Sequence, residues 1–434
     1  MKLIKKDVLI LVEHKVRELE SACLLKYAFE RRGYSVEVVS LFPCKESIPL
    51  KYSAKIIFFP WAYTNRCMRF IKCFLKYSPN ARLVNLHQEQ YEAQDSNACI
   101  PKDEAKKMYH IAWGERFKKE LLECGCDPRL VCTPGSIRLD FFKSTLKKRF
   151  WDKEGLSEKF GIAKDKSWVL YIAGAEHLLE EYQRKQISLR NKNFAEKWDT
   201  GLQCRKDFLK YVVRYLEHNS DTIFIYRPHP SYANKDKEQL DLKQIKEKYP
   251  DNFYIISELA INNWLVNANV CMSYQSTSFV ECYFAKAPYY LFRTKTLRKE
   301  IDFGLFENYE YRITSYDEFQ KALKLDGYSD ECLESILKEY YVLDDSYSYE
   351  KVVDYVLQND SVMDLHLSEK VWIYNMVRAT VKMAIRALSK VRFVKKWLLK
   401  RNDNRIFRII DNTEDAFSKR DVFELERSIK KYLQ

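Results

Sequence analysis

The sequence is poor in glycine and lacks the glycine-spaced motifs that bind phosphate. Only ten glycines occur in 434 residues, and none is spaced as GxGxxG or GxxxxGK. Both motifs need glycine where the backbone approaches a phosphate closely, so neither a Rossmann fingerprint nor a P-loop is present. A DxD triplet is absent too, which removes the simplest carboxylate pair for chelating a metal–diphosphate. We therefore expect a site that uses no metal ion and no cofactor.

Paired cysteines and long apolar runs are missing as well. The twelve cysteines are scattered without a CxxC, which predicts reduced, mostly buried thiols and excludes a zinc ribbon or a disulfide scaffold. No apolar run approaches the roughly 18–20 residues of a membrane-spanning helix. The opening, MKLIKKDVLILVEHK, has a short apolar centre and no small-residue cleavage site. It predicts a core strand of a cytoplasmic protein, not a signal peptide.

The chain is long enough for two domains of roughly 100–200 residues each, and apolar residues at 46% can fill their cores. Its first part alternates short apolar segments with amphipathic ones. A helix is expected over 16–32, ending at Gly33. The strands expected here are 7–12, 35–40, 55–59, 82–86, 109–113 and 129–133. Such alternation predicts βαβ units and a parallel sheet.

A second series of the same kind follows the charged stretch 143–155, which we interpret as a linker. Its expected strands are 168–174, 222–228, 252–257, 269–273 and 288–292, with a polar excursion over 175–205. The fold class is therefore α/β, with two Rossmann-like domains facing a cleft and a basic C-terminal helical extension. The limits expected are 1–145 for an acceptor domain, 146–345 for a nucleotide-donor domain and 346–434 for the extension. Ligands of such folds bind outside the carboxyl ends of the strands.

Two motifs follow strands of the second domain. Tyr226-Arg227-Pro228-His229-Pro230 places a histidine, fixed between two prolines, where it can donate to a phosphate oxygen, and Arg227 adds a fixed charge. A structural turn with an exposed histidine is the alternative. The second motif, Tyr274-Gln275-Ser276-Thr277-Ser278, precedes a helix that contains Glu281. Ser276 or Thr277 would be its N-cap, with free backbone N–H groups facing an anion, although an ordinary capped helix has the same pattern.

Together, RPHP after one strand and STS-x-x-E before Ala287-Pro288 resemble the nucleotide-binding half of GT-B glycosyltransferases. The likeness is to cytidine-nucleotide users: bacterial sialyltransferases, Kdo transferases and CDP-glycerol glycerophosphotransferases. The resemblance implies that His229, Ser276, Thr277 and Ser278 hold the donor phosphate and that Glu281 holds the ribose. It implies a CMP- or CDP-linked donor as substrate.

The N-terminal stretch from Val8 to Val38 is similar to the opening of bacterial surface-carbohydrate biosynthesis proteins, which carry a similar E-x-K-x-R-E pattern. In the sialyltransferase-like group, an acidic motif ending in glycine supplies the catalytic base after a strand. The matching place here is 86–90, with Gln90 in place of the glycine. Glu89 is therefore the first candidate for the general base and Glu18 the second. Either could also be an ordinary surface carboxylate.

The C-terminal part carries most of the net charge of +13. Residues 370–401 contain ten Lys or Arg and no Asp or Glu, with Arg378, Lys382, Arg386 and Lys390 four residues apart. A basic amphipathic helix predicts binding to an anionic membrane surface. The alternative is a helix that packs on the N-terminal domain with a solvated basic face. Nucleic acid is not expected, because no recognition module accompanies the helix.

The sequence thus predicts a metal-independent glycosyltransferase or polyol-phosphate transferase, with His229 also stabilising the leaving phosphate. It would act on a glycan or lipid-linked acceptor, in the cytoplasm, peripherally bound to the inner face of the plasma membrane. Three alternatives remain open: a UDP- or GDP-sugar donor, a nucleotide-sugar 2-epimerase, and a non-catalytic scaffold for polysaccharide assembly.

Overall fold

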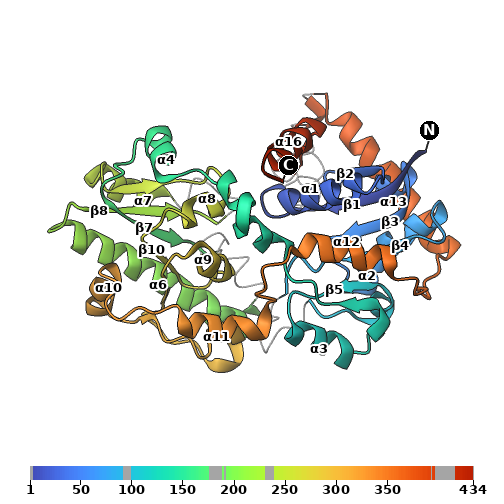
Figure 1. Cartoon of the computed structure of the whole chain (residues 1–434). Helices are drawn as coiled ribbons and strands as arrows, with labels where there is room; N and C mark the ends of the chain where they lie inside the picture. The colour runs from blue at the N-terminus through green and yellow to red at the C-terminus, as the bar shows by residue number, and fades with distance from the viewer. Residues whose placement is uncertain are drawn as a thin grey trace. The chain divides into compact units, whose positions relative to one another are not determined.

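The computed structural model describes residues 3–90, 99–174, 188–189, 192–229, 239–391, 393–395 and 416–433. The described residues form two compact units (Figure 1). Those of unit 1 lie within 1–91, 98–149 and 338–434, and those of unit 2 lie within 150–337. Each unit has its own parallel sheet and its own core, and each is described by itself.

Unit 1 is built on a six-stranded parallel sheet in the order β2-β1-β3-β4-β5-β6. Its strands are β1 (Ile4–Val12), β2 (Val36–Ser40), β3 (Tyr52–Phe59), β4 (Arg82–Asn85), β5 (Tyr109–Ile111) and β6 (Val131–Cys132). The run Val8–Val12 is buried along its whole length, as expected for a strand covered on both faces by helices. The chain passes from β1 to β2 on one side and then to β3 on the other, so the order reverses between β1 and β3.

Helices cover this sheet and come from both ends of the chain. They are α1 (Lys15–Arg31), α2 (Asn65–Ile71), α3 (Glu115–Glu123), α12 (Ser348–Gln358), α13 (Glu369–Leu388) and α16 (Lys419–Leu433). Short 3₁₀ helices lie in the connections of this unit: η1 (Lys45–Leu50), η2 (Lys72–Lys76), η3 (Asp103–Lys107), η4 (Pro128–Leu130), η5 (Ile137–Phe142) and η6 (Ser144–Arg149). Both α12 and α16 pack on α1, so the C-terminal segment completes the fold of unit 1.

Unit 2 has a second six-stranded parallel sheet, in the order β12-β11-β10-β7-β8-β9. Its strands are β7 (Ser167–Ile172), β8 (Thr222–Arg227), β9 (Phe253–Ile255), β10 (Val270–Ser273), β11 (Tyr289–Phe292) and β12 (Arg312–Ile313). Here the order reverses between β7 and β10. The core on one face of the sheet is rich in aromatic rings; Tyr171 and Phe208, for example, stack with centroids 3.8 Å apart.

The helices of unit 2 are α4 (Lys153–Phe160), α6 (Lys192–Leu216), α7 (Gln239–Lys248), α8 (Ile261–Leu265), α9 (Phe279–Ala285) and α10 (Tyr316–Leu323). Two short 3₁₀ turns, η7 (Lys299–Ile301) and η8 (Gly304–Phe306), follow β11, and α11 (Glu331–Tyr340) leads back into unit 1. Two Rossmann-like sheets in one chain confirm the expected fold class.

Each of the eleven strands expected from the sequence is present, and β12 is an additional strand. The first helix is confirmed as α1, and Gly33 follows it with φ +84°, a conformation that glycine adopts without strain. Of the stretch 175–205, residues 175–187 and 190–191 lie outside the described residues, and those from Lys192 onward form the start of α6 instead of an excursion. None of the twelve cysteines, all of which are among the described residues, forms a disulfide. Among the described residues, no helix is both long enough and apolar enough to cross a membrane.

The structure also bears on the basic segment 370–401, of which residues 370–391 and 393–395 are described. Its helix α13 packs on η1 and η2 of unit 1, which is the packing that the second alternative expected. The exposed face is not basic, however: it is formed mainly by apolar side chains. Binding of this segment to a membrane stays a prediction.

Candidate functional site

The HP motif, which the structure describes as far as His229, lies at the carboxyl end of β8 in unit 2. Arg227 is the last residue of the strand and is buried, and His229 follows two residues later, half-buried. The Arg227 guanidinium donates to the carbonyl oxygens of Ile256 at 3.3 Å, Glu258 at 2.5 Å and Leu259 at 2.6 Å. It therefore fixes the turn after β9. Burial lowers the pKa of Arg227 to about 10, so its charge is retained at neutral pH.

The serine motif lies at the carboxyl end of β10. Tyr274 is buried, Thr277 is exposed, and Ser276 and Ser278 are half-buried. The N-cap of α9 is Ser278, so the helix begins later than expected from Ser276 or Thr277. The reason is a tight turn: the Ser278 N–H donates to the Ser276 hydroxyl at 3.2 Å, and the Phe279 N–H donates to the Ser276 carbonyl at 3.2 Å.

This turn changes what the motif can offer to a ligand. The Val280 N–H also donates within the turn, to the Thr277 carbonyl at 3.3 Å. The backbone N–H groups of Ser278, Phe279 and Val280, expected to be free, are thus engaged within the turn. The motif still presents its three hydroxyl groups and the amide of Gln275, whose buried Nε2 has no hydrogen-bond partner among the described residues. Glu281 lies in the first turn of α9 with its side chain buried.

A buried ion pair holds the serine motif in place. Arg293 follows β11, and its guanidinium donates to Asp302 at 2.7 and 2.9 Å and to the Tyr274 carbonyl at 2.8 Å. Although burial acts to lower the pKa of Arg293, the Asp302 carboxylate raises it, so the arginine stays charged. The guanidinium also lies over the Tyr274 ring, 4.8 Å from its centroid. Arg293 therefore fixes the residue from which the motif starts, a role the sequence did not indicate.

The two motifs share one edge of the sheet. Tyr226 of β8 and Met272 of β10 both pair with Tyr171 of β7, which lies between them. His229 and Gln275 are each three residues beyond this level. Because neighbouring strands are about 4.8 Å apart, the two motifs start about 10 Å from each other. They flank the end of β7, next to the reversal of strand order where α/β sheets bind ligands.

Unit 1 places carboxylates at the corresponding edge of its own sheet. β1 ends at Val12, His14 is the N-cap of α1, and Glu18 lies in the first turn of that helix. The Glu18 carboxylate accepts a hydrogen bond from the Glu13 N–H at 2.7 Å. Glu18 is only 2% exposed, and this burial raises its pKa to about 7, outweighing the lowering effects of the hydrogen bond, His14 and Arg17. A carboxyl group with such a pKa can exchange a proton near neutral pH.

Trp61 follows β3 and packs at the same edge of the sheet, where its ring contacts Glu13 and Lys45. Its indole N–H donates to the Glu13 carboxylate, and the Lys45 ammonium lies 4.4 Å from the centre of the ring. β1 and β3 are the strands between which the order reverses, so this contact lies at the switch point of the sheet. His, Cys, Asp and Glu are the side chains that can bind a metal ion here. In the part of the chain that the structure describes, one group of three of them has all its ligand atoms within 4.8 Å of one another, and it consists of Glu13, His14 and Glu18. These residues could hold a cation, and the expected independence of metal stays a prediction.

Glu89 lies at the same edge, after β4, and pairs with Arg17 of α1. The side chains of both residues are about one-third exposed, at 35% and 34%. Gln90, which stands where the resembling family has glycine, braces the loop against β5: its amide donates to the Ile111 carbonyl at 3.1 Å and accepts from the Trp113 N–H at 3.0 Å. Arg17 therefore ties Glu89 to α1, the helix that carries Glu18.

Sequence reasoning missed Glu13 and Trp61 at this edge. The signal for Glu13 was present, because it follows the buried run VLILV directly, as His229 follows its strand. Trp61 gave no comparable signal, since its contact with Glu13 spans 48 residues and depends on which strands pair.

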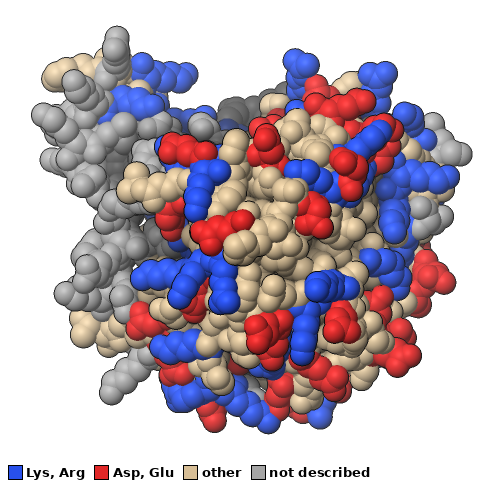
Figure 2. Space-filling view, turned by 90° about the vertical axis from the view of Figure 1, so that its left-hand side faces the viewer, with Lys and Arg blue, Asp and Glu red and all other residues tan. Residues whose placement is uncertain are grey.

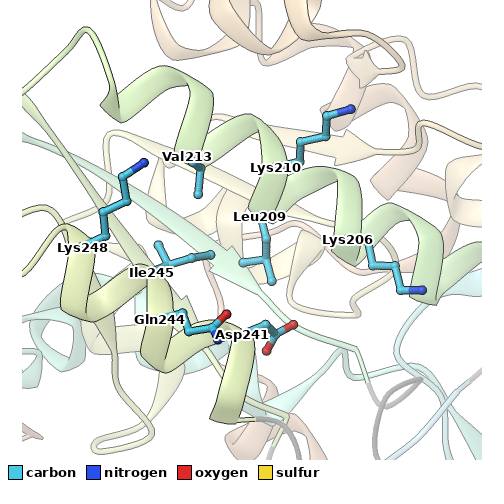
Figure 3. A pocket seen from close by; sticks show the side chains of 8 residues that line it. All are labelled: Lys206, Leu209, Lys210, Val213, Asp241, Gln244, Ile245 and Lys248. Atoms are coloured by element: carbon cyan, nitrogen blue, oxygen red, sulfur yellow. The ribbon is translucent and has the colours of Figure 1, made fainter.

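A groove in unit 2 lies elsewhere. It has a volume of about 430 Å³ and runs between α6 and α7 (Figure 3). Leu209 and Ile245 point toward each other at its centre, and its rim carries lysines (Figure 3). The full lining is Lys206, Leu209, Lys210, Val213, Asp241, Gln244, Ile245 and Lys248. None of the residues expected to bind the donor belongs to it, so the groove is not the site that the motifs predict.

Comparison with known proteins gives a fold and no family. No protein-family model and no curated protein sequence matches the chain. Among solved structures, it is similar to a putative UDP-N-acetylglucosamine 2-epimerase from Listeria monocytogenes, with a TM-score of 0.51 and 14% identity over 84% of this chain and 100% of that one. Another UDP-N-acetylglucosamine 2-epimerase gives a TM-score of 0.53 and 12% identity over 85% and 100% of the two chains.

A third similar structure is a variant of the wall teichoic acid polymerase TagF soaked with CDPG, with a TM-score of 0.52 and 12% identity over 82% of this chain and 90% of that one. At such identities the likeness establishes the fold alone. The chain therefore has the GT-B-like architecture of two Rossmann-like domains.

Proposed function

We propose that this chain is a metal-independent GT-B transferase that uses a cytidine-nucleotide donor. It would move a sugar or a polyol phosphate to a hydroxyl group of the acceptor, which is a glycan or lipid-linked precursor of a bacterial surface polysaccharide. The reaction would take place at the cytoplasmic face of the membrane. One observation carries the proposal: the HP motif and the serine motif, whose His229 and Ser276 are 47 residues apart in sequence, flank the same strand end at the switch point of unit 2. The likeness to a polymerase soaked with CDPG supports the cytidine nucleotide.

In this mechanism, unit 2 binds the donor and stabilises the leaving phosphate. The His229 imidazole and the hydroxyls of Ser276, Thr277 and Ser278 donate hydrogen bonds to phosphate oxygens, and the Arg227 charge lies at the same strand end. Glu281 accepts from the ribose hydroxyls. Because Arg293 and the tight turn fix the serine motif before substrate arrives, these groups need little rearrangement as negative charge develops on the leaving phosphate.

Unit 1 supplies the general base. Glu18 is the stronger candidate in the structure, because its raised pKa allows it to take a proton from the acceptor hydroxyl near neutral pH. Glu89 remains the second candidate, with its carboxylate held by Arg17.

A nucleotide-sugar 2-epimerase is the second candidate function. Two of the similar structures are UDP-N-acetylglucosamine 2-epimerases and are covered over their full length. A buried carboxyl group with a pKa of about 7 also suits proton transfer at a sugar carbon. A UDP- or GDP-sugar transferase and a non-catalytic scaffold are the remaining alternatives.

Calorimetric titration with CMP, CDP, UDP and GDP, without metal, tests the proposal. We expect one cytidine nucleotide to bind to the wild type and at least about tenfold more weakly to His229→Ala, which corresponds to about 1.4 kcal/mol. His218→Ala, at the end of α6 outside both motifs, is the matched control and should bind as the wild type does.

The other outcomes of this titration separate the alternatives. Binding of UDP or GDP alone would overturn the cytidine donor. Conversion of UDP-N-acetylglucosamine to its C2 epimer, followed by proton NMR, would establish the epimerase instead. Failure of all four nucleotides to bind at millimolar concentration would favour the scaffold.

A further inference from the structure

Helix α13 of unit 1 exposes an apolar stripe. Ile373, Val377, Val381 and Leu388 are each between 51% and 57% exposed, at spacings of four, four and seven residues. Side chains at these spacings lie on one face of a helix. Tyr374, Met376 and Met383 flank the stripe with exposures of 38–48%. A contiguous apolar face of this kind is unusual on a protein surface and indicates a binding surface.

The opposite face of α13 is fixed on unit 1. Trp372, Asn375 and Ala379 are buried. Trp372 packs edge-to-face on Tyr77, with centroids 5.6 Å apart, and the Asn375 amide donates to the Glu46 carbonyl at 3.0 Å. The rotation of the helix about its axis is therefore set by packing, and the apolar stripe points away from the sheet.

The cations of α13 lie further round the helix from the stripe: Arg378 is at its edge, and Lys382, Arg386 and Lys390 turn progressively toward the opposite face, since four residues advance by about 40°. Lys382 donates to both oxygens of the Glu46 carboxylate at 2.7 Å, and Arg378 approaches it at 3.3 Å. Although burial acts to raise the pKa of Glu46, these two cations lower it, so Glu46 stays ionised. Arg386 and Lys390 continue the row one and two turns further on, and residues 370–391 contain no acidic residue.

This charge distribution is not general to the molecular surface. The face shown in Figure 2 carries Lys and Arg interspersed with Asp and Glu, so no single sign prevails there. The described side chains on that face therefore differ from the cations of α13, which no acidic residue interrupts between 370 and 391.

We propose that α13 docks on an anionic lipid bilayer by inserting this apolar stripe into the boundary between headgroups and acyl chains. Arg386 and Lys390, on the side of the helix away from the stripe, would then reach the lipid phosphates through their long side chains. A bilayer matches both properties of the surface, since it offers acyl chains to the stripe and negative charge to the cations. A second copy of this chain matches only one of them, because a symmetric contact through α13 would bring together two helices that carry cations and no acidic side chain after Glu369.

The docking surface is separate from the nucleotide motifs of unit 2, so the two proposals can fail independently. The apolar stripe is tested by cosedimentation of the full chain with vesicles of phosphatidylcholine alone and with vesicles that also contain 30% phosphatidylglycerol. We expect the double variant Val377→Asp/Val381→Asp to bind the anionic vesicles at least tenfold more weakly than the wild type. The matched control is Val362→Asp/Leu240→Asp, which changes two apolar residues that are 89% and 72% exposed elsewhere, and it should bind as the wild type does.

A second set of vesicle-binding measurements tests the electrostatic contribution, by raising the salt concentration and by substituting the cations Arg386 and Lys390. In about 1 M NaCl the Debye length falls to about 3 Å, which removes most of the electrostatic attraction. We expect binding to weaken but to persist, and Arg386→Gln/Lys390→Gln to weaken it at low salt only. Complete loss in salt would overturn insertion and leave surface attraction alone.

Two further results would overturn the proposal. Equal binding of the Val377→Asp/Val381→Asp variant and the wild type would exclude the stripe as the docking surface. A wild type that is dimeric by light scattering, ignores both vesicles and becomes monomeric in this variant would assign the stripe to self-association. Thermal unfolding of each variant, expected to match the wild type because the changed side chains are exposed, excludes misfolding as the cause.

Discussion

The Glu18 carboxylate accepts a hydrogen bond from the Glu13 N–H at 2.7 Å, which ties the first turn of α1 back to the end of β1. This contact fixes a carboxyl group that is 2% exposed at the switch point of the unit 1 sheet. One hydrogen bond and the nearby positive charges do not offset the loss of water around the carboxylate, so its pKa rises to about 7. With a pKa of about 7, the carboxyl group can gain and lose a proton near neutral pH, so its ionisation should be visible in the pH dependence of the rate.

If Glu18 is the general base, the rate depends on pH in a defined direction. The active form is the ionised carboxylate, so kcat/KM should fall about tenfold per pH unit below about 7 and level off above it. Glu18→Gln should lower kcat by about 10²–10⁴-fold and remove this acidic limb. The matched control is Glu115→Gln, in the first turn of α3 with its side chain 72% exposed, which should leave the profile unchanged. An unchanged acidic limb in Glu18→Gln would exclude Glu18 as the base.

Substitutions of Glu89 and of its partner Arg17 test the alternative, in which Glu89 is the general base. The Arg17–Glu89 pair is one-third exposed, so we expect Glu89→Gln to change stability by no more than about 1 kcal/mol. With Glu18 as the base, Glu89→Gln and Arg17→Gln should each lower kcat/KM by less than about tenfold. A loss of 10²-fold or more in Glu89→Gln, with Glu18→Gln nearly active, would restore Glu89 as the base.

The sequence was sufficient to predict the strands but not every contact at their ends. Runs such as Val8–Val12 are recognisable because both faces of a parallel sheet are buried. β12 was missed because Arg312 and Ile313 form too short a segment to show any period. The residues at strand ends were predicted where a motif follows the strand, as for His229 and Ser276. Trp61 and Arg293 were not, because their contacts depend on strand pairing.

The orientation of α13 is a second feature that the sequence alone could not predict. Its composition indicated a basic amphipathic helix, and the alternative in which it packs on the N-terminal domain expected a solvated basic face. Which face turns inward is decided by partners distant in sequence: Tyr77 packs on Trp372, and Glu46 binds Asn375 and Lys382. The sequence of the helix does not indicate these partners, so the exposure of the apolar stripe could not be predicted without the structure.

A buried histidine pair predicts how stability depends on pH. His87 and His110 are fully buried, with ring nitrogens 2.8 Å apart. Burial lowers the pKa of His110 from 6.5 to about 4, and burial together with His110 lowers that of His87 well below 6.5. Between about pH 4 and 6.5 the unfolded chain therefore binds protons that the folded chain does not. The free energy of unfolding should fall as pH falls through this window, by up to about 1.4 kcal/mol per pH unit for each histidine.

This prediction is checked by urea unfolding at pH 5 and pH 7.5 of the wild type and of His87→Asn/His110→Leu. Asn suits position 87, where φ is +47°. The wild type should lose more stability on acidification than the variant does. Glu18 acts oppositely, because its raised pKa stabilises the folded state at low pH and this contribution is lost as pH rises through about 7. Its effect is common to both proteins and cancels in the comparison, so equal slopes would contradict the histidine assignment.

The Arg293–Asp302 pair connects the stability of unit 2 to its donor site. Both side chains are buried, at 3% and 9% exposure, and the arginine also holds the Tyr274 carbonyl. Arg293→Met would leave the Asp302 charge buried without its cation, so we expect a loss of about 3–5 kcal/mol in the free energy of unfolding by urea. The matched control is Arg298→Met: its pair with Glu196 is exposed, and its removal should cost no more than about 1 kcal/mol. The double variant Arg293→Met/Asp302→Leu, which removes both charges, should recover most of the lost stability. It should still bind the nucleotide more weakly than the wild type, because Tyr274 loses its anchor. Wild-type affinity in this double variant would show that the serine motif keeps its conformation without Arg293.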